Sequence, residues 1–234
     1  MTKVGSLVLF GSLLLPAVAG AQDRFGTAGQ FAISAERITS INHSSRKTED
    51  DESDVTVTTS TTNIALLTNP VGGFTTGYSF PRLAGDYFVT DGLSVGAAIG
   101  VFSTSFSSET EIDGESEESD GPTSSGVLVA PRVGYAFMFG DNIGLWPRGG
   151  VTYIGAGSEQ EDGDESSTRL FALSVEAPFV FVPVPHVAFL AGPALDLGLS
   201  GSDETDPDAA GAPNQETEYK ITDFGLHVGM TAYF

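Results

Sequence analysis

Hydrophobic residues recur at every second position over most of the chain, and no stretch after residue 21 shows the spacing of an amphipathic helix. A period of two is the pattern of a β-strand with one apolar face. Eight segments carry this pattern and are predicted as strands: residues 29–42, 77–89, 93–106, 126–139, 144–157, 168–182, 186–199 and 219–234.

The two faces of these strands differ in chemistry. In the third predicted strand one face carries Leu93, Val95 and Ile99, and the other carries Ser94 and Gly96. A soluble sandwich would turn a face rich in Lys, Thr and Glu to water. Small, sparsely charged residues instead suit the narrow lumen of a small barrel whose apolar face meets lipid. The pattern favours an all-β, eight-stranded, antiparallel up-and-down transmembrane β-barrel; the alternative is a soluble exported β-sandwich.

The connections alternate between short turns and long acidic loops. Short turns are predicted at 90–92, 140–143 and 183–185, whereas the other connections are long. In outer-membrane barrels the short turns are periplasmic and the long loops extracellular, so an even strand count places both mature termini in the periplasm. Residues 108–125, 158–167 and 201–217 are expected to be mobile because they hold few apolar residues. Within the first loop, residues 55–67 are strand-like and could form an extra hairpin.

The N-terminus has the layout of a secretory signal peptide. Lys3 precedes an apolar run from Val4 to Leu15, and small residues follow Pro16. The run is too short for a membrane-spanning helix of about 20 residues. Residues 1–21 are therefore predicted as a signal peptide and residues 22–234 as the barrel domain. The chain has no cysteine, which excludes a disulfide framework and thiolate chemistry.

Acidic residues dominate the charge and gather between the strands. The net charge is −21, which disfavours nucleic-acid binding because the basic footprint for phosphates is missing. Four stretches, 49–54, 109–120, 159–165 and 203–218, hold 23 of the 31 acidic residues. Such loops either offer oxygen ligands to Ca²⁺ or Mg²⁺ or form a solvated, repulsive surface. The candidate metal ligands are Asp113, Glu115, Glu117, Glu118, Asp120, Glu161, Asp162, Asp164 and Glu165. No other cofactor is expected.

A second set of charges falls on the small-residue face of the strands. These residues should point into the lumen: Glu36, Arg82, Asp86, Arg132, Arg148, Glu176, Asp196, Asp223 and His227. They form either an ion path or a structural plug. An eight-stranded interior is just wide enough for side chains, and buried charges must pair to offset desolvation, so the plug is favoured.

Two further features concern the strands themselves. Aromatic residues near the short turns are expected to form a periplasmic girdle: Tyr87, Phe88, Phe137, Phe139, Trp146, Phe179, Phe181, Tyr233 and Phe234. Prolines inside predicted strands argue against a closed barrel, because each removes a ladder hydrogen bond. They are Pro81, Pro131, Pro147, Pro178 and Pro193.

The last strand carries a resemblance to a known family. Its assembly-signal pattern consists of Phe224, Leu226, Val228, Met230, Tyr233 and Phe234. This alternation with a terminal aromatic looks like the C-terminal signal of outer-membrane barrels, and the whole mature chain resembles the small eight-stranded kind (OmpA transmembrane domain, OmpX, opacity proteins). The resemblance implies an outer-membrane location and recognition by the barrel-assembly machinery. It implies no ligand.

The function expected from these features is a structural and surface-interaction role, with acidic loops that serve adhesion or divalent-cation binding. A narrow channel for small solutes or ions is one alternative. A lipid-modifying enzyme is another, and His43 beside Ser44 and Ser45 is its sole outer candidate, so the chain is not expected to be an enzyme. Expected partners are outer-membrane lipid, lipopolysaccharide and the assembly machinery; the barrel is expected to be a monomer.

Overall fold

A computed structural model describes residues 24–50, 55–66, 78, 81–112, 115–159, 165–206 and 215–234. The predicted signal peptide lies outside these ranges. The strands are β1 (Phe31–Asp50), β2 (Val55–Leu66), β3 (Arg82–Phe88), β4 (Leu93–Ile112), β5 (Glu115–Tyr135), β6 (Phe137–Met138), β7 (Ile143–Leu145), β8 (Arg148–Glu159), β9 (Glu165–Glu176), β10 (Phe179–Val184), β11 (Val187–Asp206) and β12 (Gln215–Tyr233). In the described part of the chain, no helix has the length and apolar character needed to cross a membrane.

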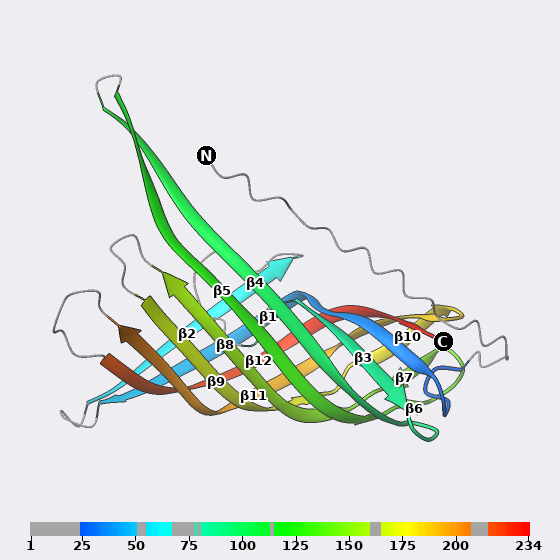
Figure 1. Cartoon of the computed structure of the whole chain (residues 1–234). Coiled ribbons are helices and arrows are strands. Elements are labelled where there is room, and N and C mark those ends of the chain that lie inside the picture. The colour runs from blue at the N-terminus through cyan, green and yellow to red at the C-terminus, as the bar shows by residue number, and fades with distance from the viewer. Residues whose placement is uncertain are drawn as a thin grey trace.

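The strands close into an antiparallel barrel, as Figure 1 shows. The last strand, β12, pairs with both β11 and β1, so the sheet has no free end at this seam. Four walls are single strands (β1, β4, β11, β12), and four are built from two segments each (β3 with β2, β5 with β6, β7 with β8, β9 with β10). This gives eight walls among the described residues. The predicted fold is confirmed, and the alternative of an open sandwich is excluded.

Within the predicted hairpin 55–67, the described residues 55–66 do not fold back on themselves. β2 is one continuous strand that pairs with the outer half of β1 from Thr39 to Asp50, and β3 pairs with the inner half of β1 from Phe31 to Glu36. Since β12 occupies the other edge of β1, β2 and β3 share one edge. β2 therefore continues the second wall above β3.

The strands run further outward than the sequence predicts. β4 and β5 pair from Leu93–Tyr135 as far as Ile112–Glu115, and they project beyond the rest of the barrel in Figure 1. β8 and β9 pair as far as Glu159–Glu165. Most of the residues predicted as mobile loops thus lie in strands, which the sequence pattern did not predict, and their mobility stays a prediction. A hairpin ladder satisfies its own backbone groups, so it needs no apolar face to continue.

Side chains alternate between lipid and lumen along each wall. On β12, Leu226 is 56% exposed and Phe224 is 55% exposed, whereas Asp223 between two outward residues is fully buried. The outward apolar residues of this strand run from Phe224 to Phe234. That length matches the 9–11 residues of a tilted transmembrane strand. The outward side chains form an apolar belt that meets lipid.

Two of the five prolines lie at interruptions of the walls. Pro147 separates β7 from β8, and Pro178 separates β9 from β10. Their carbonyl groups still accept hydrogen bonds from the neighbouring wall: Pro147 from the Tyr135 N–H (2.9 Å) and Pro178 from the Trp146 N–H (2.9 Å). At these two positions the wall breaks and resumes, whereas Pro131 lies inside β5 and Pro193 inside β11. The closed barrel therefore holds prolines both at interruptions and within continuous strands.

The short turns lie at the same end as both described termini. Thr90–Gly92 joins β3 to β4, and Gly92 has a φ of +82°, a conformation that glycine adopts without strain. The turn predicted at Pro183–Pro185 is displaced, because Val184 pairs with Val187 and the chain reverses at Pro185 and His186. At this end Phe31 and Phe234 exchange backbone hydrogen bonds of 3.0 Å.

Three residues of the predicted aromatic girdle point inward. Phe88, Trp146 and Tyr233 are fully buried, so their assignment to the lipid-facing girdle was wrong. They surround Phe25, whose ring lies 5.1–5.3 Å from all three in edge-to-face contacts. Outward-facing positions at this end are held by Tyr87, Phe137, Phe139, Phe179, Phe181 and Phe234. The inward aromatics close the short-turn end of the lumen, and we name them the aromatic floor.

The lumen is filled in layers. Above the aromatic floor lies a belt of charged residues, and beyond it a second apolar cluster includes Tyr78, Leu128, Ile154, Leu170 and Ile221. All five of these side chains are at least 98% buried. The charged layer is therefore enclosed between two apolar layers.

Candidate functional site

The enclosed charged layer is the site that the structure assembles most completely. All nine luminal candidates are buried, and seven of the eight walls supply them: Glu36, Arg82, Asp86, Arg132, Arg148, Glu176, Asp196, Asp223 and His227. The remaining wall, β4, has small inward residues such as Ser94 and Ala98, which leave space for the long side chains opposite. We call this layer the luminal ion network.

Glu36 on β1 is one centre of the network. Its carboxylate accepts hydrogen bonds from Arg132 (2.7 and 2.8 Å), from Arg148 (2.5 Å) and from Arg82 (3.1 Å). The Arg132 guanidinium also donates to Asp86 at 2.5 Å and 3.1 Å. One carboxylate therefore ties together four walls, β1, β3, β5 and β8.

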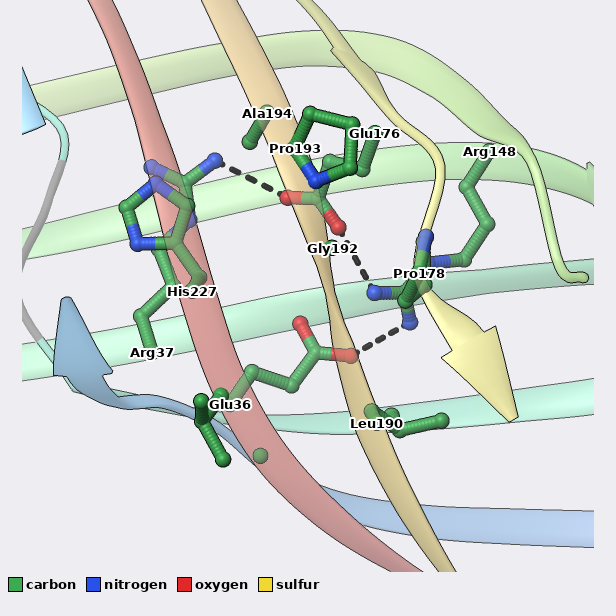
Figure 2. A pocket seen from close by; sticks show the side chains of 12 residues that line it. Glu36, Arg37, Arg148, Glu176, Pro178, Leu190, Gly192, Pro193, Ala194 and His227 are labelled. Atoms are coloured by element: carbon green, nitrogen blue, oxygen red, sulfur yellow. Dashed lines mark hydrogen bonds and ion pairs between the residues drawn. The ribbon is translucent and has the colours of Figure 1, made fainter. Parts of the chain in front are cut away.

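Glu176 on β9 is the second centre. It accepts from Arg148 at 2.7 Å, from Arg37 at 2.9 Å and from Arg82. Figure 2 shows Arg148 lying between the carboxylates of Glu36 and Glu176, so that acids and guanidinium groups alternate across the lumen. Charge-assisted bonds of this kind are stronger than bonds between neutral groups.

Arg37 belongs to the network, although sequence reasoning missed it. By strict alternation Arg37 would face lipid beside Glu36. β1 instead contains a bulge, since Ala35 pairs with Met230 and Thr39 pairs with Val228. Arg37 takes a φ of +52° there and turns inward, where it is 3% exposed and bonds to Asp196 at 2.8 Å. An arginine on the lipid face would cost about 2–4 kcal/mol. That cost was the one indication in the sequence that Arg37 turns inward.

The ion-paired groups of the network are balanced in charge. Four arginines (Arg37, Arg82, Arg132, Arg148) face four carboxylates that bond to them (Glu36, Asp86, Glu176, Asp196). Buried charges are costly unless each is paired and hydrogen-bonded. The equal count and the multiple bonds per group meet this requirement without any external ion.

A fifth carboxylate of the network, Asp223, forms hydrogen bonds with two uncharged side chains. It accepts from Asn42 Nδ2 at 2.7 Å and from the Ser44 hydroxyl. His227 lies near Arg37, and its ring nitrogens have no hydrogen-bond partner among the described residues. It lines a void of about 30 Å³ together with Glu36 and Arg148. A void of that size holds one or two water molecules, which would satisfy the imidazole.

The other outer candidates do not form a site in the described part of the chain. His43 points outward and its Nδ1 lies 2.9 Å from Thr62 Oγ1, while Ser44 points inward to Asp223. The two side chains are on opposite faces, so they do not form a nucleophile–base pair.

The acidic-loop candidates cannot be placed in a metal site. Asp113, Glu161, Asp162 and Asp164 lie outside the described residues; Glu115, Glu117, Glu118, Asp120 and Glu165 lie in strands at positions whose side chains are not described. Elsewhere in the described chain, His, Asp and Glu residues do not gather into a group of three able to hold a metal ion.

Comparison with solved structures agrees with this architecture. The outer-membrane protein AlkL matches with a TM-score of 0.54 at 11% identity, covering 92% of this chain and 94% of AlkL. This chain has the fold of the small outer-membrane β-barrels. OprG from Pseudomonas aeruginosa matches at 14% identity (TM-score 0.49, 89% and 97% covered) and Ail from Yersinia pestis at 13% (0.38, 89% and 100%). No protein-family model and no curated protein matches. The fold and the apolar belt together indicate a protein of the outer membrane.

Proposed function

We propose that this barrel is closed to solutes and acts at the cell surface, where its outer hairpins present acidic residues to the outside. The supporting observation is the luminal ion network, whose charges are mutually paired and enclosed between two apolar layers. A conducting path would need water to replace those layers. The barrel is proposed to have periplasmic termini and to be assembled through its C-terminal strand, and no catalytic role is proposed for it.

The surface role rests on where the acidic stretches lie. The stretches 49–54, 109–120, 159–165 and 203–218 all fall at or near the ends of strands remote from the short turns. Carboxylates that converge at one end of a barrel attract hard divalent cations and repel other acidic surfaces. We propose that these hairpins bind Ca²⁺ or Mg²⁺ weakly and present a cation-dependent adhesive surface.

Conductance in planar bilayers tests the closed lumen. Purified full-length protein is expected to give no channel steps, with insertion verified by heat-modifiable gel mobility of the reconstituted barrel. Arg132→Ala and Glu176→Ala are measured beside the wild type, because each substitution removes one charged side chain of the luminal ion network. Steps from the wild type that change in size with either variant would establish an ion path and overturn the proposal.

Calorimetric titration with CaCl₂ tests the cation role. The matched variant carries Asn or Gln at all seven acidic positions between 109 and 120. Wild-type binding is expected in the range of roughly 10⁻⁴–10⁻³ M, typical of extracellular sites, and should weaken in the variant. Equal heats for both proteins would refute binding by the β4–β5 hairpin.

A further inference from the structure

A groove of about 600 Å³ lies on the outer half of the barrel surface, across β1, β12, β11, β9 and β8. Three cationic side chains line it: Lys47 from β1, Arg169 from β9 and Lys220 from β12. Tyr153 and Phe171 line it too. The groove thus joins a basic region to an aromatic one.

The gathering of these cations stands out against the rest of the molecule. The chain has nine Lys and Arg residues after residue 21, and a net charge of −21 overall. Four belong to the luminal ion network, Arg24 lies at the short-turn end, and Arg46 bonds to Asp203 at 2.7 Å and stacks on Tyr219. The remaining three are the three that line this groove.

These cations lie just beyond the apolar belt. Arg169 is two residues beyond Phe171 on the outward face of β9, and Lys220 is four residues beyond Phe224 on that of β12. With a rise of about 3.4 Å per residue and a strand tilt of about 45°, these steps are roughly 5 and 10 Å along the membrane normal. That is the level of lipid headgroups.

The register places two of the cations directly opposite each other. Lys47 pairs with Lys220 across the β1–β12 ladder, and both side chains are exposed. A phosphate has several oxygens, so it can accept hydrogen bonds from more than one of these cations.

We propose that the groove binds the phosphorylated headgroup of an anionic lipid of the outer leaflet, with phosphate at Lys47, Lys220 and Arg169. Its acyl chains would lie on Phe171 and Tyr153, on the belt side. This inference rests on the proposed membrane orientation. Glu216 and Glu218 also line the groove. Their carboxylates oppose the phosphate and limit the affinity.

Lipid retention by the full-length barrel in a neutral maltoside detergent tests the proposal. Native mass spectrometry would count bound bisphosphorylated lipid A per barrel as lipid is titrated. Neutralising all three cations (K47Q, R169Q, K220Q) should weaken binding on the order of a hundredfold, at about fivefold for each charge. Glu218→Gln should strengthen it, because it removes an opposing carboxylate.

Two controls make the outcome decisive. Arg24→Gln removes one positive charge at the opposite end of the barrel and should leave lipid binding unchanged. Heat-modifiable gel mobility verifies that every variant is folded. Binding by the triple variant within twofold of wild type would overturn the proposal, and so would equally tight binding of a dephosphorylated lipid A.

Inorganic phosphate distinguishes a lipid site from a general anion site. At equal concentration it should fail to displace lipid A, because it gains nothing from the aromatic part of the groove. Full displacement would overturn the lipid assignment. The readout is independent of conductance: a barrel that conducts but retains lipid A contradicts only the closed lumen, and a silent barrel that does not bind lipid A contradicts only the groove.

Discussion

The luminal ion network and the outer groove use the same kind of side chain under opposite conditions. Inside the barrel, four arginines are at least 92% buried and each bonds to one or more carboxylates. In the groove, Lys47, Arg169 and Lys220 are exposed, and two of them face each other with like charge. The buried arginines are thus paired with carboxylates inside the barrel, whereas three of the remaining cations lie together in the groove.

This difference indicates which charges serve stability and which serve recognition. Burial makes an unpaired charge costly, so the network must be complete in the folded barrel itself. Exposed charges are screened by water and contribute little to folding, so the groove cations are expected to affect stability only slightly. Substitutions in the two regions should therefore differ in what they change.

Glu36→Gln should have the largest effect on stability. It removes one negative charge and leaves three arginines facing a neutral side chain, at a cost of about 3–5 kcal/mol. Urea unfolding in detergent, followed by the fluorescence of the sole tryptophan, Trp146, would measure it. Glu36→Gln combined with Arg148→Gln should recover part of the loss, since charge balance returns. A cost below about 1 kcal/mol would contradict a structural role for the network.

Phe25→Ala should come next, with a loss of about 3 kcal/mol. Phe25 is 1% exposed and is the centre of the aromatic floor, so its removal opens the short-turn end of the lumen. Iodide should then quench Trp146 fluorescence more strongly. The matched control is Phe181→Ala, since Phe181 is 50% exposed on the lipid face. Equal quenching in both variants would refute the sealing role of Phe25.

Gly134→Ala should cost about 1–3 kcal/mol through overpacking. A methyl group at Gly134 would come within 2.7 Å of Arg148 Cγ and 2.9 Å of Trp146 Nε1, at the boundary between the network and the floor. Gly140→Ala is the control, because no atom would lie within 4 Å of the added carbon. The same urea unfolding assay applies. If both substitutions behave alike, the inward small residues do not determine how the network packs.

Lys220→Gln should have the smallest effect on stability, within about 0.5 kcal/mol in lipid-free neutral detergent. The same variant should retain bisphosphorylated lipid A less well than wild type. Unfolding and lipid retention measured on one preparation would separate the two properties. A large loss of stability without lipid would mean that Lys220 belongs to the structural charges, and the contrast between lumen and groove would fail.

Much of the fold follows from local pattern. Alternation along 93–106 and 219–234 determines which side chains face lipid, because successive residues of a strand point to opposite faces. The same rule already implied that Phe88, Trp146 and Tyr233 point inward, since Tyr87, Leu145 and Phe234 beside them belong to the outward set. They were assigned to the girdle because they are aromatic and lie near the short turns. The alternation of side chains along the strand would have placed them correctly in the lumen.

The nine luminal charges were found by the same rule, and Arg37 was not. The bulge between Ala35 and Thr39 breaks the alternation, and it is defined by the register with β12, about 190 residues away in sequence. No local pattern specifies that register. The same limit applies to the outer strand extensions, whose polar residues carry little periodic signal.

The sequence by itself determined the strand count, the two chemical faces and the acidic ends, since each depends on neighbours along one strand. The tertiary structure alone decided that Arg37 joins the luminal ion network and that Lys47, Arg169 and Lys220 share one groove. The physical reason is that a closed barrel fixes which residues are neighbours through hydrogen-bond ladders between distant segments. Those ladders depend on tilt, bulges and closure together, which no single segment encodes.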